Sequence, residues 1–197
     1  MICAVVLAAG RSTRMGTQKL LLPFGDMPLI ARIVDEVQRG PVDQMFVVVG
    51  SDAERIQRAL SGRVVIFIKN PDGDGDMLSS IRCGLAALPE SCEAVLIVLG
   101  DQPGVTGELV AGLIGAFRTS GRGIIVPAHG NQRGHPLLFS ARYVNEVLNS
   151  FDGVGLRGLL QMHPQDVFQV AVPLAGTLCD MDTPADYESR RNQAPGE

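Results

Sequence analysis

Through residue 128, apolar runs of strand length alternate with segments whose apolar residues recur at helical spacing. Two of these runs are uninterrupted, CAVVLA at residues 3–8 and AVLIVL at residues 94–99. A strand made only of apolar side chains must be covered on both faces, as strands are in parallel sheets flanked by helices. The alternation therefore predicts an α/β fold with a mostly parallel sheet and helices on both sides.

The order of the elements follows from the same patterns. Strands are predicted at residues 3–8, 45–49, 64–68, 94–99 and 124–126, with helices at 29–37, 53–60, 77–88 and 106–117. Gly40 and Pro41 end the first of these helices, and Thr106 caps the last. Because residues 94–99 are the most apolar run, we expect them at the centre of the sheet.

Beyond residue 128 the pattern is looser. It predicts a short strand at residues 137–139, helical stretches at 141–149 and 155–162, and late strands at 167–172 and 178–181. Thr183, Pro184 and Asp186 are typical of a helix start. We expect residues 1–191 to form a single domain and residues 192–197 to be a disordered tail.

Composition limits the classes of function. No apolar run reaches the ~20 residues that span a bilayer, and no basic leader precedes the first one, so we expect a cytoplasmic protein with no membrane partner. The formal net charge of −4 disfavours nucleic acid, which binds basic faces. The four cysteines form no C-x-x-C pair and are expected to be reduced and buried; they are Cys3, Cys83, Cys92 and Cys179.

The segment after the first strand has the properties of a phosphate-binding loop. Small residues between Gly10 and Gly16 let the backbone approach a ligand, and successive N–H groups in such a turn form an anion nest. Arg14 and Lys19 add positive charge, and residues 1–25 contain no acid. The patterns G-x-x-x-x-G-K-S/T and G-x-G-x-x-G are both absent. A glycine-containing turn with solvated arginines is the plain alternative.

Acidic residues follow two predicted strands. Asp101 comes directly after the central strand, so it lies at the same sheet edge as the first loop. Asp180 and Asp182 are two residues apart on a predicted strand, so they point to the same side. Each also has a structural interpretation: Asp101 as a turn or capping residue, and Asp182 as support for the cap of the last helix.

Five ordered motifs make the chain similar to a known family. LAAGRSTRMGTQK resembles the pattern L-A-A/G-G-x-S-x-R-M-G-x-x-K of the MobA-like nucleotidyltransferases. The later motifs of that family are matched by Asn70-Pro71 with Met77–Arg82, by Gly100–Pro103, by Gly134–Pro136 and by Asp180–Pro184. The resemblance implies a Rossmann-like three-layer sandwich with a mostly parallel, mixed central sheet, as in sugar-nucleotide pyrophosphorylases.

Within that family, the pattern is most similar to that of molybdenum cofactor cytidylyltransferases. This implies transfer of CMP from CTP to the terminal phosphate of molybdenum-bound molybdopterin, with release of pyrophosphate. Ala8-Ala9-Gly10 stands where guanylyltransferases tend to have A-G-G, so Ala9 favours CTP. The resemblance also implies a divalent metal ion, Mg²⁺ or alternatively Mn²⁺. It further implies a molybdoenzyme or its maturation factor as a partner.

The resemblance assigns roles to residues in these motifs. Arg14, Lys19 and Asp101 are the expected catalytic residues, with the two basic side chains stabilising charge on phosphate. Asp101 and Asp182 are the expected metal ligands, with Asp180 as the alternative to Asp182. The expected nucleotide-binding residues are Leu7, Ala8, Ala9, Gly10, Arg11, Ser12, Arg14, Met15, Gly16, Lys19, Asn70, Ser79, Ser80 and Asp101. The expected substrate-binding residues are Gln102, Pro103, Gly134, His135, Pro136 and Arg157.

Several of these assignments have plainer alternatives. Ser79 and Ser80 are also ordinary first-turn helix residues beside a solvated acidic turn, and the acidic run at 72–76 lacks the ligands of a Ca²⁺ loop. His135 is equally well explained as a structural hydrogen-bonding group. Arg157 follows Gly153 and Gly155 and either holds a phosphate at a helix start or is an ordinary surface arginine.

Three other functions remain open from the sequence. Two are enzymatic: guanylyl transfer from GTP to the same cofactor, and cytidylyl transfer to another small phosphate. The third is a carrier that binds molybdenum cofactor and inserts it into an apoenzyme without catalysis. A carrier would have no need of Lys19, Asp101 and Asp182.

Overall fold

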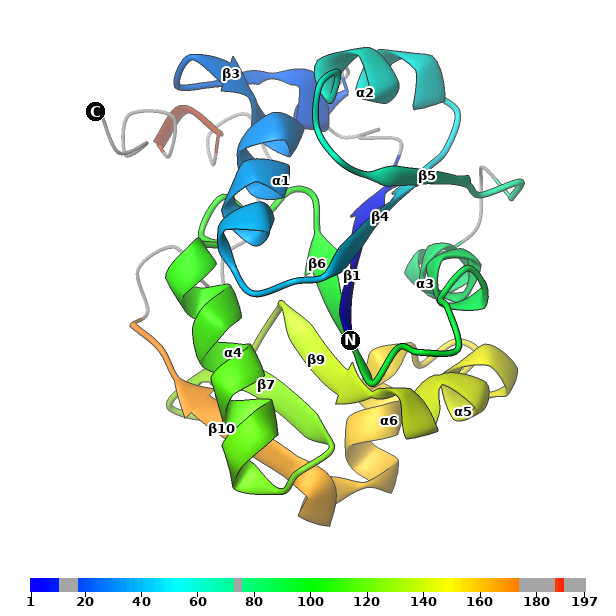
Figure 1. The fold of residues 1–197 in the computed structure, drawn as a ribbon, viewed down its shortest axis with the longest axis vertical. Helices are drawn as coiled ribbons and strands as arrows, with labels where there is room; N and C mark the ends of the chain where they lie inside the picture. Colours follow the sequence, from blue (N-terminus) through cyan, green and yellow to red (C-terminus); the bar gives the residue numbers. More distant parts are fainter. Residues whose placement is uncertain (11–17, 73–75, 174–186, 190–197) are drawn as a thin grey trace.

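A single mixed sheet runs through the molecule (Figure 1). The computed structural model describes residues 1–10, 18–72, 76–173 and 187–189. Seven strands lie in the order β10-β7-β9-β6-β1-β4-β5, and β8 pairs with β7. They are β1 (Ile2–Ala8), β4 (Gln44–Val49), β5 (Ile66–Lys69), β6 (Ala94–Leu99), β7 (Ile124–His129), β8 (Gln132–Arg133), β9 (Leu137–Ser140) and β10 (Val167–Ala171). The central place expected for residues 94–99 is confirmed.

The strand directions agree with a mostly parallel, mixed sheet. β1 is parallel to both β4 and β6, β4 is parallel to β5, and β7 is parallel to β10. β9 is antiparallel to β6 and to β7. The three parallel strands at the centre therefore end at the same edge of the sheet, which is where α/β proteins place their ligands.

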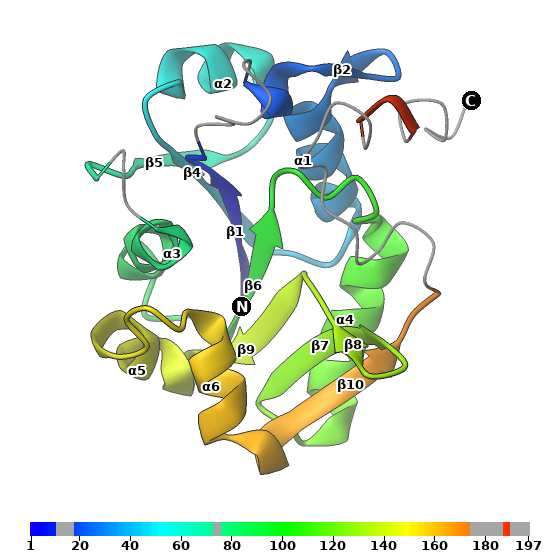
Figure 2. The same cartoon turned by 180° about the vertical axis from the view of Figure 1, so that it is seen from behind.

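Helices cover both faces of the sheet. The helices are α1 (Leu29–Arg39), α2 (Ala53–Ala59), α3 (Met77–Ala86), α4 (Gly107–Ser120), α5 (Val144–Asn149) and α6 (Leu156–Met162), with 3-10 turns η2 (Lys19–Leu21), η3 (Ala141–Tyr143) and η4 (Pro164–Asp166). α1 and α4 lie on one face, and α3, α5 and α6 on the other (Figures 1 and 2). The predicted three-layer architecture is thus confirmed.

The alternation of side chains along β1 explains the two cores. Ala4 and Val6 pack with α1 and α4, whereas Cys3 and Val5 pack with α3, α5 and α6. All four side chains are fully buried, as the continuous apolar run predicts. Cys3, Cys83 and Cys92 are free thiols, and burial raises the pKa of Cys3 to about 12. Cys179 lies outside the described residues.

The capping residues act as predicted. Gly40 ends α1, and its N–H donates to the Val37 carbonyl oxygen. The Thr106 hydroxyl accepts from the Leu109 N–H at 3.2 Å at the start of α4. Glu36, a buried acid on α1, accepts from the Gly107 N–H at 3.0 Å and thereby joins α1 to the positive end of the α4 dipole.

Some predicted boundaries differ from the structure. The strand predicted at residues 64–68 begins instead at Ile66, because residues 63–65 form a turn in which the Val65 N–H donates to the Arg63 carbonyl. Val64 is 87% exposed in that turn. The helix predicted at 77–88 ends at Ala86, and the strand predicted at 124–126 continues to His129. The strand predicted at 178–181 and the helix start at Thr183 lie outside the described residues.

Sequence patterns missed a small hairpin. β2 (Pro23–Phe24) and β3 (Met27–Pro28) pair antiparallel around Gly25, which has a φ of 71°. The Gly25-Asp26 dipeptide was the available turn signal. Tyr187 is buried against this hairpin, and its hydroxyl donates a hydrogen bond to the Pro23 carbonyl oxygen. Tyr187 thus belongs to the core on the α1 and α4 face of the sheet.

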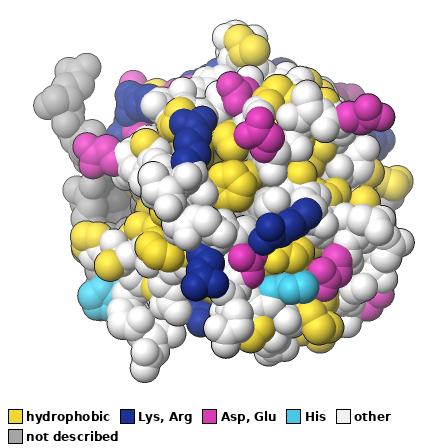
Figure 3. Space-filling view, turned by 60° about the horizontal axis from the view of Figure 1, so that its bottom comes forward, with side chains coloured by type: hydrophobic (Ala, Val, Ile, Leu, Met, Phe, Trp, Pro, Cys, Tyr) yellow, Lys and Arg dark blue, Asp and Glu magenta, His cyan; other side chains and the backbone are white. Residues whose placement is uncertain are grey.

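A polar cluster lies where η4 connects α6 to β10, at the bottom of Figure 1. The Asp166 carboxylate accepts hydrogen bonds from the Arg142 guanidinium and the Tyr143 hydroxyl. Although burial opposes its charge, these bonds and one from the Gly123 backbone lower the pKa of Asp166. Seen from this end, basic and acidic side chains alternate over the surface (Figure 3).

We predict that Asp166→Asn lowers the free energy of unfolding by about 1 kcal/mol at pH 7. The folded state keeps Asp166 ionised at lower pH than the unfolded chain does, so this stabilisation is present above the unfolded pKa and is lost as pH falls through the folded pKa. Urea unfolding should therefore give a difference of about 1 kcal/mol between wild type and variant at pH 7 and a smaller difference at pH 3. Asp26→Asn, at an exposed turn, is the control and should change neither value.

Candidate active site

Three loops meet where β1, β4 and β6 end. Ala8 is paired with Val49 and Leu7 with Leu99, so the residues that follow these strands lie side by side. A Cβ added to Gly50 would lie 2.7 Å from the Ala9 carbonyl oxygen, and one added to Gly100 would lie 2.7 Å from the Leu7 carbonyl oxygen. Only glycine permits this close approach of three backbones.

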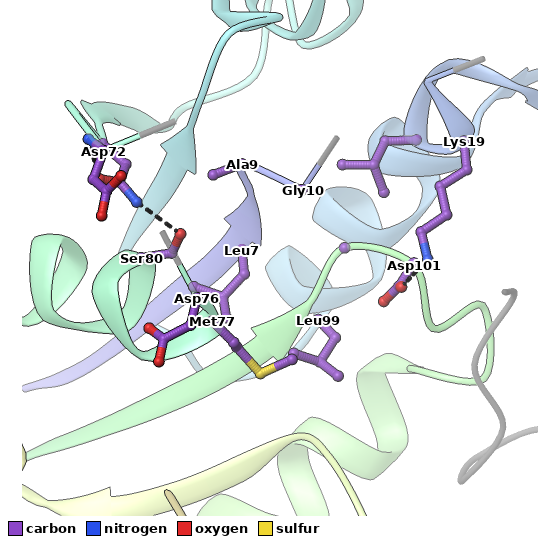
Figure 4. Close-up of a pocket in the computed structure, with 13 residues that line it drawn as sticks. Leu7, Ala9, Gly10, Lys19, Asp72, Asp76, Met77, Ser80, Leu99 and Asp101 are labelled. Carbon is purple, nitrogen blue, oxygen red and sulfur yellow. Dashed lines mark hydrogen bonds and ion pairs between the residues drawn. The ribbon is translucent and has the colours of Figure 1, made fainter. Parts of the chain in front are cut away.

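A pocket of about 200 Å³ lies over this junction. Its lining includes seven of the nucleotide-binding residues predicted from the sequence, which are Leu7, Ala9, Gly10, Lys19, Asn70, Ser80 and Asp101. Figure 4 shows Lys19 and Asp101 on one side of the pocket and Ser80, Asp72 and Asp76 on the other. The pocket lies on the α3 face of the sheet. Ala8 points to the opposite face, where it is buried in the core, so only its backbone is available to a ligand.

An ion pair occupies one wall of this pocket. Lys19 Nζ and Asp101 Oδ2 are 2.5 Å apart, and their side chains are 15% and 21% exposed. Lys19 begins η2, and Asp101 comes two residues after the end of β6. The structure therefore confirms the expected placement of Asp101 at the edge that carries the first loop. Here it is paired with the lysine rather than capping a helix.

The opposite wall is the start of α3. Asp76 caps this helix, because its Oδ1 accepts from the Ser79 N–H at 2.9 Å. The Ser79 hydroxyl donates back to the Asp76 carbonyl oxygen, so Ser79 takes part in the cap. Ser80 is buried and lines the pocket. The structure thus separates two serines that the sequence could not distinguish.

Asn70 holds this wall in place. Its Nδ2 donates to the hydroxyl oxygens of Ser79 and Ser80, each at 3.0 Å. Its Oδ1 accepts from the Asp72 N–H at 2.9 Å. Asn70 is only 4% exposed. These contacts give Asn70 a structural role, which is to fix the serines at the start of α3, and its role in nucleotide binding stays a prediction.

A larger pocket of about 1000 Å³ adjoins the first and shares Asp76, Met77 and Leu99 with it. Four predicted substrate-binding residues line it: Gln102, Gly134, His135 and Arg157. Pro136 is buried, and neither it nor Pro103 is among the described lining residues. Arg133 and Gln169 also line this pocket, and the sequence analysis did not anticipate them.

Arg82 ties this second pocket to α3. Its guanidinium donates to the carbonyl oxygens of Val147 and Ser150, at 3.1 and 2.7 Å, and to the Asp152 carboxylate at 2.7 Å. The loop that it holds continues to Gly153 and Gly155, which line the pocket. The only sequence signal was the place of Arg82 at the end of the Met77–Arg82 motif.

Several predicted residues lie outside the described part of the chain. They are Arg11, Ser12, Arg14, Met15, Gly16, Asp180 and Asp182. Their assignments remain predictions, as does the choice between the last two aspartates as a metal ligand.

The donor set fits a metal that arrives with a nucleotide. Within residues 1–10, 18–72, 76–173 and 187–189, no three His, Cys, Asp or Glu side chains form a cage for an ion. Asp101 offers a hard carboxylate inside the pocket, whereas the Asp76 carboxylate on the other wall is engaged in the cap of α3. Mg²⁺ often takes only one or two carboxylates, and phosphates and water complete its shell.

Among the described helices, none has the length and apolar character needed to cross a membrane.

Comparison with known proteins agrees with this geometry. The MobA-like NTP transferase domain family matches residues 4–167. The molybdenum cofactor cytidylyltransferase of Escherichia coli K12 is 26% identical over 187 residues, covering 94% of this chain and 93% of that protein. The bifunctional GlmU protein of Mycolicibacterium paratuberculosis is 36% identical over 121 residues, but the chain spans only about a quarter of its length.

Solved structures show the same fold. A nucleotidyl transferase from Methanothermobacter superposes with a TM-score of 0.85 at 28% identity, covering 98% of this chain and 97% of that one. A manganese complex of a Mycobacterium tuberculosis H37Rv protein superposes with a TM-score of 0.78 at 26% identity, covering 97% and 98% of the two chains. The chain belongs to the MobA-like NTP transferase family, and residues 4–167 match the NTP transferase domain of that family.

We predict that Asp101→Asn lowers the rate of pyrophosphate release from a nucleoside triphosphate about 100-fold, because the pocket loses the carboxylate that faces Lys19. Asp35→Asn is the matched control, because Asp35 also forms an ion pair, with Arg63 at 2.6 Å, but lines neither pocket, and it should change the rate less than about threefold. An Asp101→Asn enzyme that keeps a third or more of the wild-type rate would contradict this role.

Proposed function

We propose that this enzyme transfers CMP from CTP to the phosphate of molybdenum-bound molybdopterin and releases pyrophosphate. The observation that supports this most directly is the pair of adjoining pockets with shared walls. The smaller pocket contains Lys19 and Asp101, and the larger one is open to a second substrate. The name of the E. coli relative, which aligns along nearly the whole chain, supports this choice of acceptor.

The triphosphate is assigned to the smaller pocket. Among the described residues that line it, Lys19 carries the positive charge. Together with Arg14, it would neutralise charge on the departing pyrophosphate. Asp101 would hold Mg²⁺, with Asp182 as its second carboxylate. A divalent ion held by these carboxylates, Mg²⁺ or Mn²⁺, would reduce the negative charge of the phosphates. The manganese complex of the Mycobacterium tuberculosis neighbour is consistent with such an ion.

The acceptor is assigned to the larger pocket. Arg133 and Arg157 lie in its lining, so it offers positive charge to an anionic substrate. Met77 and Val154 are about half exposed there and offer apolar surface to a flat ring. A phosphate nucleophile is already ionised at neutral pH, so the reaction needs no general base. His135 is assigned to substrate contact rather than to proton transfer.

Two related activities fit the same pockets. One is transfer of GMP from GTP to the same cofactor, and the other is transfer of CMP to another small phosphate. Membership of a transferase family favours either of these over a non-catalytic carrier. Both are separated from the proposed reaction by the substrates that support turnover.

We predict that the enzyme, supplied with Mg²⁺ and molybdenum cofactor, releases pyrophosphate fastest with CTP among the four ribonucleoside triphosphates. An assay in which a pyrophosphatase converts the released pyrophosphate to phosphate measures these rates. A mass-spectrometric product of cofactor plus CMP should appear at the same rate. Equal rates with CTP and GTP would overturn the cytidylyl assignment, and no pyrophosphate with any triphosphate would favour the carrier.

Ala9 is the residue proposed to favour CTP. Its methyl group lines the smaller pocket beside Gly10. We predict that Ala9→Gly lowers the ratio of kcat/KM for CTP to that for GTP by about fivefold, because removal of one methyl changes discrimination by about 1 kcal/mol. Ala8→Gly is the control, since the Ala8 side chain points into the opposite core. An unchanged ratio in Ala9→Gly would place base selection elsewhere.

A further inference from the structure

Gln18 is a buried polar residue that the proposed chemistry does not use. It directly precedes Lys19 and is 7% exposed. Its Nε2 donates to the Gly10 carbonyl oxygen at 3.0 Å and to Asp52 Oδ2 at 3.0 Å. A carbonyl oxygen and a carboxylate are both acceptors only, so they fix the side-chain amide with its NH₂ group between them.

Asp52 is a firm anchor for this contact. It precedes α2, and its carbonyl oxygen accepts from the N–H groups of Arg55 and Ile56 at 3.0 and 3.1 Å. Its second carboxylate oxygen accepts from the Arg55 guanidinium at 3.2 Å. Gln18 therefore connects Gly10, at the end of the first strand, to the beginning of a helix.

Gln18 and Lys19 together connect the residues that follow β1, β4 and β6. Gln18 reaches Asp52, which follows β4, while Lys19 reaches Asp101, which follows β6. The bond from Gln18 to Gly10 also fixes the distance between the two residues that flank positions 11–17.

We propose that Gln18 is a positioning residue for the triphosphate. It fixes the position of Gly10 relative to Lys19, both of which line the smaller pocket, and it engages the Gly10 carbonyl oxygen, which would otherwise repel phosphate oxygens there. It also fixes both features relative to α2. This inference rests on the proposed nucleotide site, and it adds a residue that does not itself touch the reacting phosphate.

The test uses Gln18→Glu, which keeps the shape and turns the donor into an acceptor facing two acceptors. The KM for CTP and the calorimetric Kd for CTP with Mg²⁺ should both rise about tenfold or more, with kcat within about threefold of wild type. Gln38→Glu is the matched control. Gln38 is an α1 glutamine that donates to the Val64 carbonyl at 3.3 Å and lines neither pocket, so KM should not change.

Two further variants separate positioning from simple loss of stability. Gln18→Glu combined with Asp52→Asn restores a hydrogen bond between the two positions with donor and acceptor exchanged, so KM should fall back at least about threefold. Asp52→Ala leaves Gln18 intact but removes its anchor, so KM should rise even if Gln18→Glu does not fold. A KM that follows the melting temperature alone across these variants would assign a merely structural role and overturn the inference.

The outcomes also separate this inference from the proposed function. If wild type releases no pyrophosphate from any triphosphate, the proposed reaction fails, and the calorimetric Kd still tests Gln18. If wild type is active and Gln18→Glu changes neither KM nor Kd, the inference about Gln18 fails and the proposed function stands. If wild type binds no nucleotide in the calorimeter, both fail.

Discussion

The parallel pairing of β1 with β4 on one side and β6 on the other is the constraint on which the site depends. This register brings Ala9, Gly50 and Gly100 to one edge of the sheet. The 2.7 Å that would separate a Cβ at either glycine from the β1 strand end shows how little space remains there. Because packed backbones resist movement, the pocket above them has a rigid floor. The chemistry of the pocket is then set by the side chains that line it.

Those side chains are organised by pairs that cross from one loop to another. Lys19 with Asp101 and Gln18 with Asp52 join adjacent residues of one segment to opposite sides of β1. On the other wall, Asn70 holds the serines of α3, and Arg82 holds the loop of the larger pocket. α3 is therefore a common support for both pockets. In the proposed reaction, this shared wall would place the donor and the acceptor substrate next to each other, which is what group transfer requires.

Sequence patterns located much of this site because they identify strand ends. Asp101 could be placed beside the first loop, since both follow strands that end at one edge. The same patterns could not find Gln18, whose role depends on Gly10 and on Asp52, thirty-four residues away along the chain. They could not choose between Ser79 and Ser80 either. That choice depends on which serine the Asp76 cap engages and which one faces the pocket.

The sequence by itself determined the α/β class, the central place of residues 94–99 and the family, because apolar periodicity and ordered motifs are local properties of the chain. Only the tertiary structure decided the rest. It made β9 antiparallel to its neighbours, buried Tyr187 against the β2–β3 hairpin and paired Lys19 with Asp101. It also brought Gln18 into contact with both Gly10 and Asp52. Each of these depends on contacts between segments far apart in sequence. Such contacts form only when burial of both cores fixes how distant segments pack together, and local patterns do not encode that packing.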